Sequence, residues 1–378
     1  DRHARAMHAR RPLATITAGF VALAGLALVS PSSASAVEVG DEAALRAAFA
    51  DPAEVAITLT ADITIACDGD NQIVRSDPTD DLVIDGGGHT ITFPCSDGNE
   101  SLFVVGDSPA SFNTLTLRDL RAVDTGTGYA LAFVDGFLVL EDVETDGWGD
   151  VLRADTVTVA RSYLHGAAEA VVRPDSDATV VDSTLAGGET AIQASGNGST
   201  PVVVRNSTIV GMESSGIDAV DVALELEHVT FADNARHLNV GGSLMSTGSA
   251  YGPADQPCSL DAEVTGGYNA DLGACWPAED AASTDRQDLT SAEMALGALS
   301  GEPRPVHRLG TGSVLIDAIP AGSCPLAADE LGTARPQGAG CDVGAVEVLA
   351  AAAPTPPAPG PTPAPAAQPT PATPRFTG

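Results

Sequence analysis

The chain has 378 residues and a formal net charge of −33, because 51 acidic side chains face only 18 basic ones, all of them arginine. A surface this acidic, without clusters of basic residues, argues against nucleic acid and anionic lipid as partners. It is compatible with cations and with neutral or basic ligands.

The first 36 residues predict a cleaved secretory signal. Four arginines precede an apolar stretch from Leu13 to Val29, and the small residues Ala34-Ser35-Ala36 follow it. This order of basic, apolar and small residues is typical of a signal peptide. A membrane-anchoring helix is the alternative, but the run is short and is interrupted by threonines and glycines. We therefore expect cleavage after Ala36, a secreted mature chain and no transmembrane span within it.

Residues 37–56 are expected to form an N-terminal cap. The segment from Asp41 to Ala50 has the pattern of a short amphipathic helix, with Asp41 as its N-cap residue. The open end of a strand stack exposes unpaired backbone groups, which a helix can cover. The first stacked strands are expected to begin near Ile57.

Residues 57–250 repeat a pattern made only of short strands. Each repeat has an alternating apolar strand, a polar corner residue and a second apolar strand, and the corners are Asp119, Asp142, Arg161, Asp182, Asn206 and His228. The corners are separated by 23, 19, 21, 24 and 22 residues. Such a period is typical of one turn of a solenoid. We predict an all-β fold: a right-handed, single-stranded parallel β-helix of the pectate-lyase-like type.

Two other architectures fit the repeat less well. No helical periodicity of ten or more residues interrupts it, which excludes alternating strands and helices. A sandwich of antiparallel hairpins would need Asn-Gly or Asp-Gly turns every 8 to 12 residues. Those pairs occur only sporadically. Glycines such as Gly126, Gly147 and Gly188 instead mark tight corners between short strands.

Six cysteines in an exported chain predict disulfides. Short loops favour local pairs, although six cysteines allow fifteen connectivities. The favoured pairs are Cys67 with Cys95, Cys258 with Cys275, and Cys324 with Cys341. A metal site is the alternative, but no Cys-x-x-Cys or His-Cys cluster supports it.

The repeat decays after about Tyr251. We interpret residues 251–348 as a disulfide-stapled C-terminal region that continues and closes the stack. Residues 349–378 are rich in proline, alanine and threonine. Such a tract cannot form a core and is expected to be a disordered, extended tail.

The C-terminal region resembles a known family through three segments: Ile316–Cys324, Asp329–Gly332 and Arg335–Glu347. They are similar to the C-terminal module of choice-of-anchor Q domain proteins, bacterial surface proteins that pair a right-handed β-helix with varied envelope anchors. The resemblance is specific from Ile316 to Glu347 and looser from Val37 onward. It implies an extracellular or cell-envelope-associated β-helix without a settled activity. The last residues, Pro374-Arg-Phe-Thr-Gly, do not form the Leu-Pro-x-Thr-Gly sorting signal, so the mode of anchoring stays open.

Alignment of the repeats suggests one cluster of functional residues. Asp146 and His165 each follow their corner by four residues, and Asp150 and Glu169 by eight. Neighbouring turns would stack each pair about 5 Å apart. Nearby in sequence are Trp148, Arg153 and Arg173. An exposed tryptophan beside acids suits sugar binding, whereas the alternative is a solvated loop edge with a half-buried tryptophan.

Metal binding is a subsidiary hypothesis at this cluster. Calcium prefers several oxygen ligands, which Asp146, Asp150 and Glu169 could supply. No other metal or cofactor is expected. Two further features, Asp80-Asp81 and Gly88-His89-Thr90, lack the context of a catalytic motif and are interpreted as structural.

Two functions remain for these residues. The first is a secreted or surface-displayed scaffold, adhesin-like or glycan-binding, whose partner is an extracellular glycan or cell-surface component. The second is a polysaccharide lyase or glycoside hydrolase with Asp150 and Glu169 as candidate catalytic residues. Fold alone cannot decide between them. An open groove with converging acids and an arginine would favour the enzyme, and a flat or loop-covered surface would favour the scaffold.

Overall fold

The structure is a computed structural model that describes residues 36–349, except 70, 77–79, 97–99, 107–112, 197–200, 274, 277–280 and the side chains of 262–264. The expected signal segment (1–36), apart from Ala36, and the expected tail (349–378), apart from Leu349, lie outside these residues. The described part is one compact unit.

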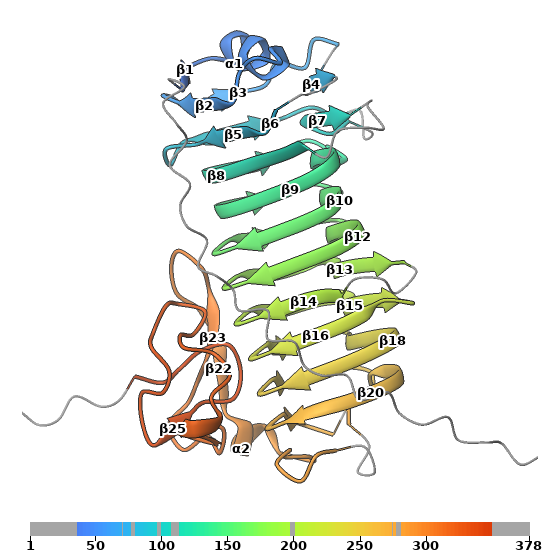
Figure 1. Ribbon diagram of the computed structural model, residues 1–378, viewed down its shortest axis with the longest axis vertical. Helices are drawn as coiled ribbons and strands as arrows, with labels where there is room; N and C mark the ends of the chain where they lie inside the picture. Colours follow the sequence, from blue (N-terminus) through green and yellow to red (C-terminus); the bar gives the residue numbers. More distant parts are fainter. Residues whose placement is uncertain are drawn as a thin grey trace, which may run out of the picture. The chain divides into compact units, whose positions relative to one another are not determined.

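The predicted parallel β-helix is confirmed (Figure 1). Within the described residues, 21 strands form one sheet, and every pairing in it is parallel. In chain order they are β1 (Val37–Val39), β2 (Ala56–Leu59), β3 (Ile63–Thr64), β4 (Ile73–Ser76), β5 (Leu82–Asp85), β6 (Thr90–Phe93), β7 (Phe103–Gly106), β8 (Asn113–Asp124), β9 (Ala130–Asp146), β10 (Asp150–Ala160), β11 (Tyr163–His165), β12 (Ala170–Val181), β13 (Thr184–Ser195), β14 (Pro201–Arg205), β15 (Thr208–Val220), β16 (Ala223–Glu227), β17 (Thr230–Ala232), β18 (Arg236–Thr247), β19 (Ala250–Tyr251), β20 (Ser259–Gly267) and β21 (Ala270–Asp271).

Each turn of the helix contributes to three faces. Face A is formed by the strand segments that precede the corner residues, face B by the segments that follow them, and face C by the segments between face B and the next face A. In one turn these are residues 156–160, 163–165 and 170–174. Alternate side chains point inward, as a strand's period of two requires, so that Leu140, Val159 and Val204 stack without solvent exposure.

The corner residues share one backbone conformation. Their φ angles lie between 42° and 55°, in the left-handed region, at all six predicted positions: Asp119, Asp142, Arg161, Asp182, Asn206 and His228. Short polar side chains tolerate this region better than β-branched or bulky apolar ones. This preference explains why polar residues recur there in the sequence.

A ladder of buried serines lies directly behind the corners. The backbone N–H of Val143 donates to Ser162 Oγ at 3.1 Å, that of Ser162 to Ser183 Oγ at 3.1 Å, and that of Ser183 to Ser207 Oγ at 3.3 Å. A buried N–H group without a partner is costly. The serines therefore satisfy backbone donors that the corner turns away from the regular strand pairing.

The N-terminal cap is also as predicted. Helix α1 (Glu42–Ala50) begins at Asp41, whose side chain accepts from the N–H of Ala44 at 2.9 Å. At the other end of α1, the buried Arg75 of β4 donates to the carbonyls of Phe49 and Asp51 at 3.0 and 2.8 Å. These bonds satisfy carbonyls that a helix end leaves unpaired.

The last described segment turns back along the stack (Figure 1). Residues 291–347, here called the C-terminal module, contain α2 (Ser291–Met294), β22 (Leu296–Ser300), β23 (Val306–Leu309), β24 (Ile319–Pro320), the 3₁₀ turn η1 (Ala321–Ser323) and β25 (Gly340–Cys341). All three expected disulfides are present: Cys67–Cys95, Cys258–Cys275 and Cys324–Cys341. The third lies inside the module.

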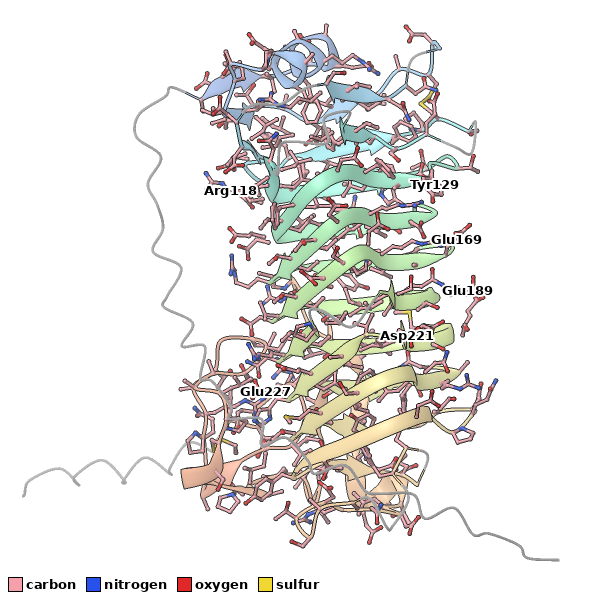
Figure 2. All side chains as sticks on the ribbon, turned by 45° about the vertical axis from the view of Figure 1, so that its right-hand side comes forward. Arg118, Tyr129, Glu169, Glu189, Asp221 and Glu227 are labelled. Atoms are coloured by element: carbon pink, nitrogen blue, oxygen red, sulfur yellow. A yellow bond between two sulfur atoms is a disulfide. The ribbon has the colours of Figure 1, made fainter. Side chains whose placement is uncertain are left out.

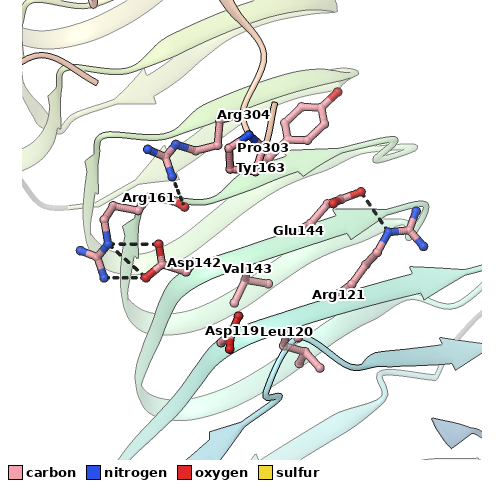
Figure 3. Close-up of a pocket in the computed structure, with 11 residues that line it drawn as sticks. Asp119, Leu120, Arg121, Asp142, Val143, Glu144, Arg161, Tyr163, Pro303 and Arg304 are labelled. Carbon is pink, nitrogen blue, oxygen red and sulfur yellow. Dashed lines mark hydrogen bonds and ion pairs between the residues drawn. The ribbon is translucent and has the colours of Figure 1, made fainter. Parts of the chain in front are cut away.

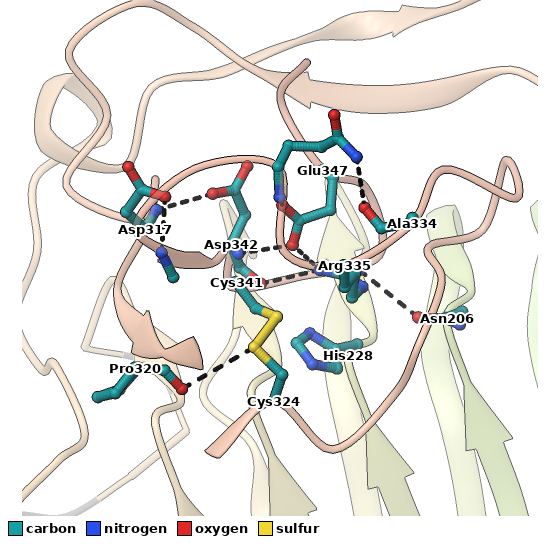
Figure 4. The surroundings of a disulfide bond; sticks show 12 residues. Asn206, His228, Asp317, Pro320, Cys324, Ala334, Arg335, Cys341, Asp342 and Glu347 are labelled. Carbon is teal, nitrogen blue, oxygen red and sulfur yellow. Dashed lines mark hydrogen bonds and ion pairs between the residues drawn. A yellow bond between two sulfur atoms is a disulfide. The ribbon is translucent and has the colours of Figure 1, made fainter. Parts of the chain in front are cut away.

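The segments that carry the family resemblance form a network of buried polar contacts around that disulfide (Figure 4). Arg335 and Glu347 are paired at 2.7 Å, with side chains no more than 1% exposed. Arg335 also donates to the carbonyls of Gly344 and Asp342 at 2.8 and 3.1 Å. Both terminal nitrogens of Arg335 thus have acceptors within the module, and these contacts join the segments of residues 335–347 to one another.

The corner conformation gives a first prediction. Replacing the exposed Asp119 with valine, Asp119→Val, should lower the free energy of unfolding by about 1–2 kcal/mol, because a β-branched residue is strained at positive φ. Asp119→Gly should be about neutral, and Thr116→Val, on the strand before this corner, should change stability by less than about 0.5 kcal/mol. Urea denaturation measures all three. Equal effects of Asp119→Val and Asp119→Gly would contradict the prediction.

Candidate functional site

The C-terminal module covers only part of face B. From the turn of Thr184 onward, the outward positions are small or hydroxylated. Ala186, Val210 and Ala232 pack against Leu296 and Leu299 of β22. The Thr230 hydroxyl accepts from the N–H of Ala345 at 2.8 Å. This half of face B is therefore an internal interface.

The preceding turns present charged and aromatic side chains on face B, and the module covers them only in part, since Tyr163 also packs at the edge of the cluster that contains Ala186 and Leu296. Tyr163 pairs in register with Glu144, and His165 with Asp146. Arg121 Nε donates to Glu144 at 3.0 Å, and the Tyr163 ring stacks on His165 with centroids 4.3 Å apart. We call these five residues the open patch.

A pocket of about 310 Å³ lies where the open patch meets the module (Figure 3). We call it the seam pocket. The β-helix supplies its floor, and the loop after β22 supplies a wall through Pro303 and Arg304. Its lining is completed by Gly88, Asp119, Leu120, Arg121, Asp142, Val143, Glu144, Arg161 and Tyr163.

Two arginines connect the pocket to its surroundings. Arg161 forms a bidentate contact with Asp142, with Nη2 to Oδ2 at 2.9 Å and Nε to Oδ1 at 3.2 Å. Arg304 donates from Nη1 to the carbonyl of Arg161 at 2.9 Å and from Nη2 to the carbonyl of Glu330 at 3.1 Å. Arg304 therefore ties the pocket wall both to a corner of the β-helix and to the module.

Two groups of the pocket, Arg161 and Tyr163, have pKa values raised above their ordinary range. Hydrogen bonding to Asp142 raises the pKa of the Arg161 guanidinium. Burial, followed by the charges of Glu144, Asp146 and Glu302, raises the pKa of the Tyr163 phenol. The pocket thus combines the neutral aromatic hydroxyl of Tyr163 with the carboxyl groups of Asp142 and Glu144 and the guanidinium group of Arg161. Such a set can accept and donate several hydrogen bonds beside an apolar ring face.

The predicted register of one pair is confirmed. Asp146 lies beside His165, with Oδ1 to Nδ1 at 3.5 Å, and both belong to the open patch. Arg121 reaches Asp146 as well, at 3.8 Å.

The predicted stacking of Asp150 on Glu169 is wrong. Asp146 pairs with His165 at an offset of 19 residues, whereas Leu152 pairs with Val172 at an offset of 20. The extra residue lies in the intervening turn, so the N–H of Ala170 donates to the Asp150 carboxylate at 3.1 Å. Asp150 is buried, and the Glu169 side chain is 58% exposed.

Trp148 is not exposed as a sugar platform would require. Its side chain is 3% exposed, and its ring stacks on Phe93 with centroids 5.5 Å apart. The remaining candidates lie on face C. Arg153 donates to the Tyr129 hydroxyl at 2.9 Å, and Arg173 contacts Asp150 at 3.0 Å and Glu169 at 3.7 Å. Figure 2 shows Tyr129 and Glu169 on this side of the stack, away from Arg118.

The calcium hypothesis gains no support from these positions. Asp150 is occupied by Arg173 and by a backbone N–H, and it is buried away from Asp146 on a different face. Among the described residues, no group of three or more His, Cys, Asp or Glu side chains is arranged to hold a metal ion.

Several lining residues were not among the sequence candidates. Glu144 and Tyr163 precede Asp146 and His165 by two positions, so strand alternation places them on the same outer face. Extending the alignment by two residues would have found them. Pro303 and Arg304 reach the pocket only because the module turns back, and no local pattern indicates that.

The chain is a parallel β-helix of the pectate-lyase-like class. Residues 36–161, which include the cap and the first turns, match the family model described as "Putative pectate lyase-like adhesive domain". A search of curated proteins gives no match. Among the described residues, no helix has the length and apolar character needed to cross a membrane.

Two solved structures are partly similar to this chain. The structure entitled "L. reuters 100-23 SRRP" has 12% sequence identity and a TM-score of 0.43, over 67% of this chain and 92% of that one. The structure entitled "L. reuteri 53608 SRRP" has 13% identity and a TM-score of 0.39, over 67% of this chain and all of that one.

The contacts of Arg173 give a second prediction. Arg173→Ala should lower the free energy of unfolding by about 2–3 kcal/mol, because it leaves the buried Asp150 carboxylate without its counter-charge. Glu169→Ala removes only an exposed partner and should cost less than about 0.5 kcal/mol. Urea denaturation at neutral pH compares the two. A similar small effect of both changes would show that Asp150 does not depend on Arg173.

Proposed function

We propose that this chain is an extracellular, adhesin-like β-helix that binds glycans at the seam pocket and the adjoining open patch. The observation that carries the proposal is the pocket itself, which places an aromatic ring beside several charged hydrogen-bonding groups. The family model matched by residues 36–161 describes an adhesive domain, which supports the same class of function.

The pocket chemistry suits a sugar. A pyranose ring has apolar C–H faces that pack on aromatic rings, and its hydroxyls both donate and accept hydrogen bonds. Tyr163 offers the ring, Glu144 and Asp142 offer acceptors, and Arg121 offers donors. Because these groups come from neighbouring rungs held in register, they are fixed before the ligand arrives, which reduces the entropy lost on binding.

Charge favours neutral glycans over acidic ones. The pocket arginines are engaged by the protein's own groups: Arg161 by Asp142, Arg121 by Glu144, and Arg304 by two carbonyls. An acidic sugar would have to displace these partners and approach a chain of net charge −33. A neutral glycan avoids both costs.

The geometry supports binding more than catalysis. Of the two candidate catalytic carboxylates, Asp150 is fully buried, hydrogen-bonded and paired with Arg173. A general base must reach the proton that it removes, and Asp150 is not accessible to a substrate. Glu169 is exposed on face C and is held at 3.7 Å by Arg173. The exposed Glu189 lies beside it on the next turn, where Ala170 pairs with Thr190.

An extracellular location agrees with the chemistry of the chain. Three disulfides within the described residues suit an oxidising compartment. We further propose that the chain is related to the choice-of-anchor Q proteins, because the segments that carry that resemblance fold together around the buried ion pair of Arg335 and Glu347. The signal sequence expected before Val37 fits export.

Removing the aromatic ring gives a third prediction. Tyr163→Ala should weaken binding of the best neutral glycan on a glycan array by about tenfold, because the stacking surface is lost. Phe137→Ala, which removes an aromatic residue on face A that is 38% exposed, is the matched control and should have no effect. Calorimetry measures both. Unchanged affinity for Tyr163→Ala would place binding elsewhere, and turnover of a polysaccharide that is lost in Glu169→Ala would establish the enzyme instead.

The charge argument gives a fourth prediction. Binding of a neutral glycan should change by less than about twofold between about 0.05 and 0.5 M salt, because no net charge is exchanged. A carboxylated glycan with the same backbone should bind about tenfold more weakly at the low salt concentration and recover at the high one. Tighter binding of the acidic glycan at low salt would contradict the proposal.

A further inference from the structure

Glu330 occupies the centre of the interface between the module and face B. Its side chain is fully buried. Oε1 lies 2.7 Å from Thr184 Oγ1, and Oε2 lies 2.7 Å from Thr208 Oγ1. The two threonines are paired in register on β13 and β15. One carboxyl group of the module therefore bridges two turns of the β-helix.

The hydrogen atoms in this cluster can be counted. Thr184 Oγ1 lies 2.7 Å from Glu330 Oε1 and also 2.8 Å from the carbonyl oxygen of Pro305. A hydroxyl has one hydrogen to donate, and a carbonyl can only accept. If Thr184 donates to Pro305, the short contact to Glu330 needs a hydrogen from the carboxyl group. Thr208 supplies its own hydrogen to the other oxygen. The full set of contacts is satisfied only by a protonated Glu330.

The surroundings of Glu330 agree with the neutral form. Burial, with a smaller contribution from the charge of Asp182, raises the pKa of Glu330 to about 8 despite the opposing hydrogen bonds from Thr208 and Thr184 and the charge of Arg304. Asp182 is itself near Arg161 and Asp329, and burial raises its pKa too. Arg304 donates from Nη1 and Nη2 to the backbone carbonyls of Arg161 and Glu330 rather than to the Glu330 carboxyl group.

We propose that the protonated carboxyl of Glu330 is a latch that holds the C-terminal module on face B, and that loss of this proton releases the module. The latch is connected to the seam pocket by the backbone. Pro305, whose carbonyl contacts Thr184, directly follows the pocket residues Pro303 and Arg304. Release of the latch therefore removes one wall of the pocket. The consequence for glycan binding rests on the proposed function, whereas the latch does not.

The pH dependence follows from proton uptake on docking. The pKa of Glu330 is raised in the docked state, from an ordinary value of 4.5 to about 8. Docking is therefore most favourable below about pH 4.5 and weakens as the pH rises towards 8. In that interval the equilibrium constant for module release should rise by about tenfold per pH unit, because one proton is lost on release. Above about pH 8 it should become constant.

Hydrogen exchange of the full chain tests the latch. Peptides from residues 301–347 are followed by mass spectrometry between about pH 5 and 9, in the wild type and in Glu330→Gln, and the rates are divided at each pH so that intrinsic exchange cancels. A glutamine amide donates to Thr184 and accepts from Thr208 without ionising. The ratio should therefore rise about tenfold per pH unit below pH 8. Glu189→Gln, at an exposed side chain on face C beside Glu169, is the control. The ratio of wild-type to Glu189→Gln exchange rates should not change with pH.

Two outcomes would overturn the latch. One is a ratio that does not change with pH. The other comes from the wild type alone, labelled with ¹³C in its glutamate carboxyl groups: no carboxyl titrating near pH 8 would contradict a protonated Glu330 and does not depend on whether the variant folds. If the pH-dependent release of the module is observed but no glycan binds, the latch is supported and the proposed function is refuted. If a glycan binds with the same affinity from pH 6 to 9, the proposed function is supported, but the link between the latch and the pocket is refuted.

Discussion

The left-handed corner is the constraint on which the rest of the structure depends. A parallel stack stays in register when successive turns bend at the same place, and six successive turns, from Asp119 to His228, bend at a residue with positive φ. The conformation selects Asp, Asn, His or Gly from turn to turn, with Arg161 as the exception. The bend also turns backbone N–H groups away from the strand pairing, and the hydroxyl oxygens of Ser162, Ser183 and Ser207 accept hydrogen bonds from them. Polar corners and buried serines are thus two consequences of one bend.

Because the corners align the turns, each outward position of face B becomes a column with its own chemistry. One column begins with Arg121, Glu144 and Tyr163 and continues with Thr184 and Thr208. Charged and aromatic side chains are long and hydrated, so a covering segment would have to desolvate them. Threonine and alanine are short and allow close approach. The change of composition along the column therefore decides where the module packs and where the surface stays open for a ligand.

The same alignment shows how far sequence can reach. Period and alternation predict the fold, the corners, the cap and the pair Asp146–His165, since these depend on spacing within and between neighbouring turns. Spacing fails at Asp150 and Glu169, because one inserted residue in a turn shifts the register without leaving a signal in the repeat. The burial of Trp148 follows from its contact with Phe93, and the pocket wall of Arg304 follows from a module that returns from far along the chain. Both depend on contacts that no local pattern encodes.

An acidic side chain at the centre of an internal interface has a physical consequence that an apolar one would not have. An interface made only of Leu296, Leu299, Ala186 and Val210 would be equally stable at every pH. Glu330 adds a condition, because a buried carboxylate is unfavourable whereas the neutral acid completes the bonds of Thr184 and Thr208. Apolar contacts therefore hold the module on face B, and one proton on Glu330 makes this docking dependent on pH. Since the module also forms a wall of the seam pocket, the shape of the ligand site is tied to the protonation of a residue that no ligand touches.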